Sequence, residues 1–303
     1  MARTLVVHPG ALGDVLLAVP ALRALRAAAP DGELALAAQP RIATLLAALG
    51  VVDRPLAFDG LGLDALFTED GAAPGALRDA ARVVCWFGAR DPVFVRRLTA
   101  LAPGAVVAPP AGRDGPVWEH LVLTVGAAPD ARWRAPLAPP PPLVADGRRR
   151  LGALGWDGRA PLVVVHPGAG SAAKRWAAEG FAAALGGLAA DGPLGIVVHQ
   201  GPADADAVGA LLPRLPRAAL TLEAPSLPCL AGVLAHARAY LGNDSGVSHL
   251  AAALGVPSVV LFRLEHLAWA PWAAAARVLV VEMAAPIGGD VERVRSALQG
   301  LVG

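Results

Sequence analysis

The segment LGNDSGVSHLAAALGVPSVVLF, residues 241–262, decides the fold of this chain. Its pattern predicts the end of a buried strand, a glycine-containing turn, a helix and a second buried strand. Gly246 lets the backbone turn tightly and come close to a ligand. The N–H groups of Ser245, Gly246 and Val247 would open the helix, where backbone donors and the helix dipole attract an anion. The segment therefore predicts a diphosphate-binding turn, with His249 one helical turn beyond Gly246 on the same face.

The same alternation runs along the chain, which has two matching halves. Residues 5–11 (LVVHPGA) and 163–169 (VVVHPGA) are matching strand-to-turn units. Continuous Val/Leu runs separated by helices indicate strands buried on both faces, and so parallel sheets. Strands are expected at 4–8, 33–38, 82–87, 105–108, 162–166, 194–199, 219–222, 239–242 and 258–262. Helices are expected at 15–28, 41–49, 92–101, 118–126, 177–190, 204–212, 227–236, 247–254 and 290–301.

The composition limits the classes of function that the chain can have. The chain has 303 residues, is 55% hydrophobic and carries a formal net charge of +1. This length is typical of two domains, and the balanced charge provides no field that selects nucleic acid. The two cysteines lack a partner motif, which fits a reducing compartment. With no signal peptide and no apolar run long enough to span a bilayer, we expect a cytoplasmic protein; peripheral contact with the inner membrane surface stays open.

Three segments, in this order, resemble the motifs of glycosyltransferase family 9, the ADP-heptose:lipopolysaccharide heptosyltransferases and their relatives. They are residues 10–23 (GALGDVLLAVPALR), residues 166–176 (HPGAGSAAKRW) and the 241–262 segment. The resemblance implies an α/β fold of the GT-B type, in which two doubly wound Rossmann-like domains face each other across a cleft.

A proline-rich stretch marks the expected domain boundary, because Pro136 and Pro139–Pro142 favour a stiff, extended linker. We expect an N-terminal acceptor-side domain at 1–142 and a nucleotide-sugar-binding domain at 143–288. The resemblance implies that a C-terminal helix at 289–303 crosses back to the first domain.

The resemblance also implies the reaction. It is an inverting, metal-independent transfer of a heptose-like sugar from a nucleoside diphosphate donor, ADP-linked in the family, to lipopolysaccharide or another surface glycan, without a cofactor. A lipid-linked saccharide acceptor fits as well. Two alternatives stay open: another GT-B sugar-nucleotide enzyme such as an epimerase, and a non-catalytic nucleotide-sugar-binding protein.

Two residues are assigned catalytic roles by the resemblance. Asp14 would take the proton of the acceptor hydroxyl as the glycosidic bond forms. Its alternative is a helix cap, which aspartate fills well. Lys174 would compensate the charge that grows on the leaving diphosphate. Its alternative is a solvated Lys-Arg pair ahead of a helix.

The remaining binding residues follow the same motifs. The glycine-rich turns contribute Gly13, Gly170 and Ser171, and the helix start contributes Ser245, Gly246, Val247 and His249. Asp204 matches an acid that binds the nucleotide ribose in the family, but it is one methylene shorter, and a plain helix cap is the alternative. Asp244 is expected to contact sugar hydroxyls or to cap the helix, and the alternative for Ser245 is likewise a plain N-cap.

Two further patterns bear on metal and donor. The histidines show no ligand spacing, and Asp204-Ala205-Asp206 opens a predicted helix, where residues two apart do not face each other. No metal site is therefore expected. After Phe262 the family often continues Gly-Pro-Thr, whereas this chain has Arg263-Leu264-Glu265, so the donor sugar stays open.

Overall fold

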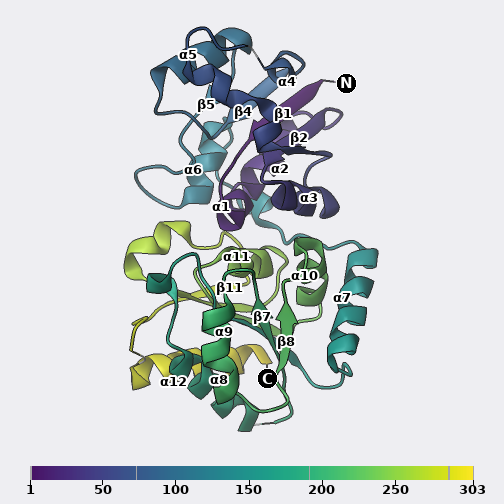
Figure 1. Ribbon diagram of the computed structural model, residues 1–303, viewed down its shortest axis with the longest axis vertical. Helices are drawn as coiled ribbons and strands as arrows, with labels where there is room; N and C mark the ends of the chain where they lie inside the picture. The colour runs from purple at the N-terminus through teal and green to yellow at the C-terminus, as the bar shows by residue number, and fades with distance from the viewer. Residues whose placement is uncertain (1, 73, 191, 286, 303) are drawn as a thin grey trace. The chain divides into compact units, whose positions relative to one another are not determined.

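The computed structural model describes residues 2–72, 74–190, 192–285 and 287–302. The chain forms two compact α/β domains, Met1–Ala135 and Pro136–Gly303 (Figure 1). In the described part of the chain, no helix combines the length and hydropathy that a membrane span requires.

The first domain is built on a five-stranded parallel sheet with the order β3-β2-β1-β4-β5. This is the doubly wound arrangement, in which the chain moves outward from β1 in both directions. Its strands are β1 (Arg3–Val7), β2 (Glu33–Ala38), β3 (Arg54–Ala57), β4 (Arg82–Cys85) and β5 (Val106–Val107). The apolar residues 5–7 of β1 are buried on both faces of the sheet, as the continuous Val/Leu pattern predicted.

Helices surround this sheet. They are α1 (Leu12–Leu17), α2 (Val19–Ala28), α3 (Pro40–Ala48), α4 (Gly75–Arg78), α5 (Pro92–Leu101) and α6 (Val117–Thr124). Leu77 of α4 and the α5 residues Phe94 and Leu98 pack on alternate side chains of β1, including Leu5 and Val7. The predicted helix at 15–28 is two helices that meet at Ala18, because Pro20 begins a new first turn.

The second domain has a six-stranded parallel sheet with the order β11-β10-β9-β6-β7-β8. The arrangement repeats that of the first sheet and adds one strand at an edge. The strands are β6 (Leu162–His166), β7 (Gly195–Gln200), β8 (Leu220–Glu223), β9 (Ala239–Asn243), β10 (Ser258–Phe262) and β11 (Ala276–Val280).

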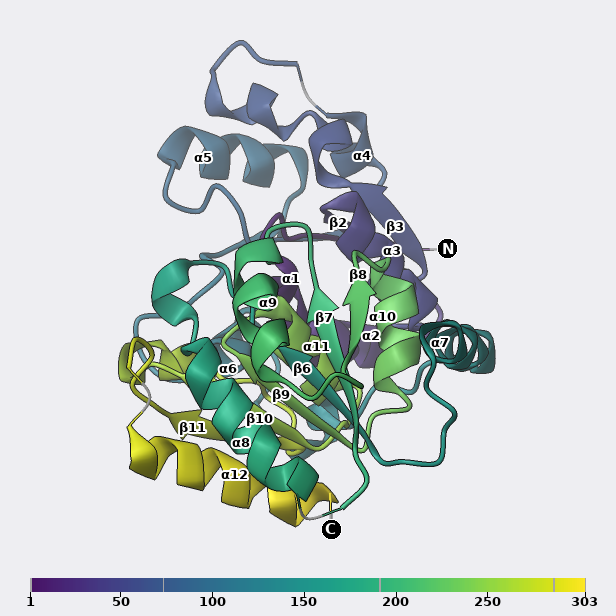
Figure 2. The same cartoon turned by 60° about the horizontal axis from the view of Figure 1, so that its bottom comes forward.

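Helices cover both faces of the second sheet (Figure 2). They are α7 (Pro141–Leu154), α8 (Ala178–Ala190), α9 (Ala205–Leu211), α10 (Leu227–Leu234), α11 (Gly246–Ala253) and α12 (Gly288–Val302). Residues of α8, α9 and α12 share one core with the strands, while α10 and α11 lie on the other face with α7 outside α10.

The domain boundary differs from the prediction. The second domain begins at Pro136, and the expected linker prolines lead directly into α7, with Pro141 as its first residue. Proline suits that position because its fixed φ matches a helix and its missing N–H has no partner there. Helix α7 packs closely on α10, since a Cβ added to Gly147 would lie 2.1 Å from the carbonyl carbon of Gly232.

The C-terminal helix also differs from the expectation of a crossing to the first domain. It is present as α12, and its buried residues Val294, Ala297 and Leu298 belong to the core of the second domain, beside α8. The edge strands β3 and β11 escaped prediction because both carry exposed side chains and lack the continuous buried run of the inner strands.

Candidate functional site

The carboxyl ends of β6 and β9 lie side by side in the second sheet, with His166 opposite Gly242. From β6 the chain continues to β7 on one side, and from β9 it continues to β10 on the other. Such a reversal leaves a crevice beyond the strand ends, where open α/β sheets bind their ligands. The fold therefore brings two predicted motifs, residues 166–176 and 241–262, to one place.

Helix α11 opens at this point. Ser245 is its N-cap, and the Ser245 Oγ accepts a hydrogen bond from the Ser248 N–H at 3.4 Å. The first N–H groups of a helix have no partner within it, so Gly246 and Val247 present donors at the positive end of the helix dipole. Of the two residues that could cap this helix, Asp244 and Ser245, it is Ser245 that does so, and its contact with a phosphate stays a prediction.

The Lys174 ammonium joins the two motifs. Its Nζ lies 2.7 Å from Oδ2 of Asp244, and the Asp244 side chain is only 7% exposed. Lys174 ends a short 3-10 helix, η4 (Ala172–Lys174), and Asp244 directly follows β9. The neighbouring Arg175 donates instead to the carbonyl of Ala203. Lys174 is thus paired with Asp244 at the start of α11, unlike the fully solvated pair of the alternative, and its contact with a diphosphate stays a prediction.

A compositional signal at this position went unused in the sequence analysis. Lys174 is the only lysine of the chain, and the other basic residues among the 26 are all arginines. A lysine ammonium is a compact charge with three rotatable donors, whereas arginine presents a planar fork. The only lysine ammonium of the chain, a compact cation, therefore lies at the N-terminus of helix α11.

Asn243 holds the turns in place, and sequence reasoning missed it. Its amide is fully buried; Oδ1 accepts from the N–H of Trp176 at 3.0 Å, and Nδ2 donates to the carbonyl of Pro167 at 2.8 Å. One side chain thus fixes both ends of the 167–176 turn to the end of β9. The signal was a polar residue placed directly after an apolar strand run. Trp176 itself is buried against Phe181, so its side chain packs in the core of the second domain.

Two buried hydroxyl groups, those of Ser248 and Tyr240, support the start of α11. Ser248 Oγ donates to the carbonyl of Asn243 at 2.5 Å and lies 2.9 Å from the hydroxyl of Tyr240. Burial is the main cause that raises the pKa of Tyr240, so this phenol stays neutral. Neither residue was predicted.

His249 lies in α11 and is 5% exposed. Burial lowers its pKa to about 4, and the nearby Asp244 carboxylate opposes that shift. The imidazole is therefore neutral at pH 7, and it adds no charge toward a diphosphate. The positive charge at this site comes from Lys174 and the helix.

The other predicted residues of the 166–176 turn lie on its open side. Gly170 and Ser171 are exposed, and Ser171 precedes η4. Gly168 is buried and must be glycine, because an added Cβ would lie 2.1 Å from Oδ1 of Asp204. This close approach lets the carboxylate pack under the turn.

Asp204 is the N-cap residue of α9, but its side chain makes no bond to that helix. Instead its Oδ2 accepts from the N–H of Gly201 at 3.0 Å, and the residue is 8% exposed. Its shortness relative to glutamate thus lets it fold back onto the end of β7. The Asp204 side chain does not cap α9, so the helix-cap alternative is wrong. The ribose contact stays a prediction.

Two histidines share this corner. Nδ1 of His199 lies 3.0 Å from Nδ1 of His166, and Nε2 of His166 lies 4.0 Å from Oδ2 of Asp204. Among the described residues, these three are the group able to hold a metal ion. Linear spacing could not reveal this group, because adjacent strand ends bring residues together that are distant in the sequence. Burial lowers the pKa of His166 to about 4 and that of His199 to about 3, so the contact is a hydrogen bond between neutral rings.

In the first domain, Asp14 is the third residue of α1, with Gly13 one residue earlier. Asp14 Oδ2 accepts from the N–H of Ala11 at 3.1 Å. The carboxylate therefore caps the helix start from within the first turn, and its role as a base stays a prediction. The turn before it repeats that of the second domain: an added Cβ on Gly10 would lie 2.8 Å from Cε1 of His8.

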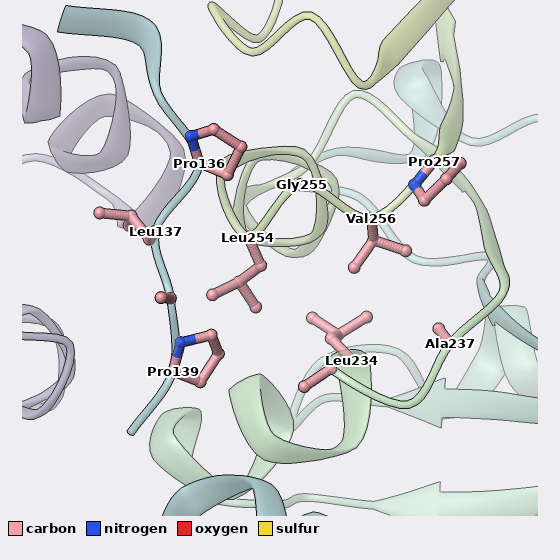
Figure 3. Close-up of a pocket in the computed structure, with 11 residues that line it drawn as sticks. Pro136, Leu137, Pro139, Leu234, Ala237, Leu254, Gly255, Val256 and Pro257 are labelled. Carbon is pink, nitrogen blue, oxygen red and sulfur yellow. The ribbon is translucent and has the colours of Figure 1, made fainter. Parts of the chain in front are cut away.

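Among the described residues of the second domain, two cavities bear on ligand binding. One, of about 450 Å³, is lined by Ala173 beside Lys174, by Arg263, Leu264 and Glu265 after β10, and by residues 280–284. The other, of about 360 Å³, lies between the segment 136–139 and the ends of α10 and α11. Figure 3 shows Leu234 and Leu254 pointing toward each other across it. Its lining has no charged side chain, so the first cavity, next to the only lysine, is the one that suits a charged ligand.

Comparison with known proteins agrees with this geometry. Residues 139–290 match the model of glycosyltransferase family 9 (heptosyltransferase). The chain belongs to glycosyltransferase family 9. The matched region contains the crevice, Lys174 and the start of α11, so the resemblance stated from the motifs is confirmed.

This family 9 glycosyltransferase also resembles individual proteins. It is 33% identical over 118 residues to lipopolysaccharide heptosyltransferase 3 of Escherichia coli, a match that covers 36% of this chain and 34% of that protein. The chain therefore aligns with about a third of the length of this curated relative.

Solved structures match over nearly the whole chain. The E. coli ADP-heptose lps heptosyltransferase II has a TM-score of 0.76 at 20% identity, covering 99% of this chain and 98% of that one. A family 9 glycosyl transferase from Veillonella parvula has a TM-score of 0.78 at 18% identity, covering 99% and 97%. E. coli heptosyltransferase WaaC with ADP has a TM-score of 0.69 at 20% identity, covering 99% of each chain. At these identities the likeness concerns the fold, and the predicted GT-B class with two Rossmann-like domains is confirmed.

Proposed function

We propose that this protein transfers a heptose-like sugar from an ADP-linked donor to lipopolysaccharide or a related surface glycan, with inversion and without a metal. The observation that carries the proposal is the Lys174–Asp244 pair at the start of α11, at the reversal point of the second sheet. Family membership supports glycosyl transfer, and the similar proteins carry ADP, ADP-heptose or lipopolysaccharide in their names.

The donor diphosphate would bind where the charge suits it. The N–H groups of Gly246 and Val247 and the Lys174 ammonium would face the phosphates, with Ser171 on the open side of the turn. Asp244 would then meet sugar hydroxyls, and Asp204 at the end of β7 would serve the ribose. As the anomeric carbon–oxygen bond breaks, negative charge moves onto the diphosphate, and preorganised donors stabilise it.

The acceptor would be activated from the first domain. Its hydroxyl oxygen forms the new bond to the anomeric carbon on the face opposite the departing phosphate, which inverts the configuration. Its proton passes to the Asp14 carboxylate. Arg41 and Arg90 are exposed after the carboxyl ends of β2 and β4 and would meet an anionic acceptor. By contrast, Arg23 and Arg97 donate to backbone carbonyls, so they serve the fold.

The test is a transfer assay with ADP-heptose and a lipopolysaccharide-core acceptor that lacks the terminal heptose. We expect release of ADP and a mass gain of one heptose on the acceptor, both resistant to EDTA. Release of ADP without a labelled acceptor would show hydrolysis rather than transfer. Absence of turnover with ADP-, UDP- and GDP-sugars alike, in spite of ADP binding, would replace this proposal with a binding protein.

A further inference from the structure

The segment after β10 departs from the family pattern, and it reaches the proposed donor site. It forms a 3-10 helix, η6 (Leu264–Trp269). Nδ1 of His266, on this helix, lies 3.6 Å from Oδ2 of Asp244, a separation too long for a hydrogen bond. That nitrogen is buried and has no hydrogen-bond partner among the described residues. A polar atom is thus held close to a buried carboxylate without contacting it.

The same Asp244 oxygen is shared by two groups. Lys174 Nζ lies 2.7 Å from Oδ2 and His266 Nδ1 lies 3.6 Å from it. When a diphosphate binds beside Lys174, the ammonium is drawn toward the phosphates, and Asp244 loses part of its compensating charge. Water cannot replace that charge, because the side chain of Asp244 is 7% exposed and a buried charge without a partner is costly.

We infer that His266 is a positioning residue for donor binding. As Lys174 turns to the diphosphate, the imidazole closes the remaining gap, donates to Asp244 Oδ2 and holds the carboxylate toward the donor sugar. This inference rests on the proposed function and adds to it that η6 is part of the nucleotide-sugar site, although its sequence lies outside the family motifs.

The surroundings of His266 fit that role. The nearest charged residues on its own segment, Arg263 and Glu265, pair with each other at 2.5 Å. Arg263, Leu264 and Glu265 line the cavity of about 450 Å³ whose wall also includes Ala173, next to Lys174. The segment therefore borders both the lysine-bearing turn and an open volume of about 450 Å³, which is within the usual size range of ligand pockets.

A double-mutant cycle tests the inference, with ADP as the probe and titration calorimetry at pH 7 as the measurement. His266→Gln should weaken ADP binding about 10-fold, or about 1.4 kcal/mol. In an Asp244→Asn background the same change should cost less than about 2-fold, because the buried carboxylate that needs the imidazole donor is then absent. His266→Lys should restore binding to within about 3-fold of the wild type. Leu267→Ala is the matched control on the same helix, 38% exposed, and should bind ADP like the wild type.

The outcomes separate the inference from the proposed function. Equal losses from His266→Gln in both backgrounds would show that the histidine only supports the fold of η6. Unchanged ADP affinity in His266→Gln would remove it from the donor site while leaving the proposed function intact. Absence of ADP binding by the wild type at millimolar concentration would overturn the proposed ADP donor and this inference together.

Discussion

Replacing Lys174 with alanine should weaken nucleotide binding and destabilise the second domain at the same time. A charge-assisted hydrogen bond contributes about 1.5–3 kcal/mol, which corresponds to a roughly 10- to 150-fold higher Kd for ADP. The stability effect comes from Asp244, which would lose its partner at 2.7 Å while staying 7% exposed. Removing one member of a buried ion pair costs about 3–5 kcal/mol. Because the Lys174 side chain is 30% exposed, water screens part of this, and we expect about 1–2 kcal/mol, or roughly 2–8 °C in Tm.

Three measurements check this prediction. Calorimetry reports ADP affinity, and thermal unfolding reports stability. The single lysine offers the third: apart from the α-amino group, Lys174 carries the only primary amine of the chain. An amine-reactive acyl ester should therefore label one side chain, read by mass spectrometry, and ADP should slow the labelling.

Matched variants separate the two effects of this mutation. Lys174→Ala combined with Asp244→Asn should recover most of the lost stability but none of the ADP affinity, since the buried charge is gone and the phosphate ligand is still missing. Arg175→Ala, the adjacent cation, should bind ADP within about 2-fold of the wild type. The reasoning is refuted if Lys174→Ala binds ADP like the wild type, or if ADP leaves the labelling rate unchanged.

Four further outcomes are expected. Asp14→Asn keeps an acceptor for the Ala11 N–H, so Tm should hold while heptosyl transfer falls about 10²–10⁴-fold; unchanged turnover would exclude Asp14 as the base. Asn243→Ala leaves the N–H of Trp176 and the carbonyl of Pro167 without their partner, so the free energy of unfolding in urea should drop by about 2–4 kcal/mol. Transfer should be unaffected by EDTA, because Lys174 and α11 supply the positive charge; restoration by added Mg²⁺ after EDTA would contradict this. Finally, burial lowers the pKa of His8 from 6.5 to about 4, so the unfolded chain binds more protons between those values and stability should fall as the pH drops through that window. Urea unfolding at pH 7 and pH 5 should show a loss of up to about 2 kcal/mol from this residue, and His8→Asn should reduce it.

Much of the fold was readable from local pattern. The inner strands were predicted closely, and β2, β6 and β10 to the residue, because a continuous apolar run can be buried only in a sheet covered on both faces. The edge strands β3 and β11 and the helix α7 were not. The side chains of β3 and β11 are largely exposed, so these two strands carry a weak pattern, and the prolines that begin α7 also suit an extended linker.

The candidate site likewise contains residues that the local sequence could predict and residues that it could not. Ser245–Val247 could be assigned from the turn itself, since a helix N-terminus needs only neighbouring residues. Lys174 was identified by its place in a motif, but its contact with Asp244 joins residues 70 positions apart in the chain. The buried amide of Asn243 bonds across 67 positions, and His266 approaches Asp244 from the segment that follows the next strand, β10. No local pattern encodes these contacts.

By itself the sequence determined the secondary structure of the inner sheets, the family and the two turns that suit phosphate, because hydrophobic periodicity and turn chemistry are local properties. Only the tertiary structure decided which side chains meet. It paired Lys174 with Asp244, turned Asp204 beneath Gly168, and brought His166 and His199 together at adjacent strand ends. The physical reason is that a doubly wound sheet aligns the carboxyl ends of strands that are distant in the chain, and the order of those strands is set by packing of the whole domain rather than by any single segment.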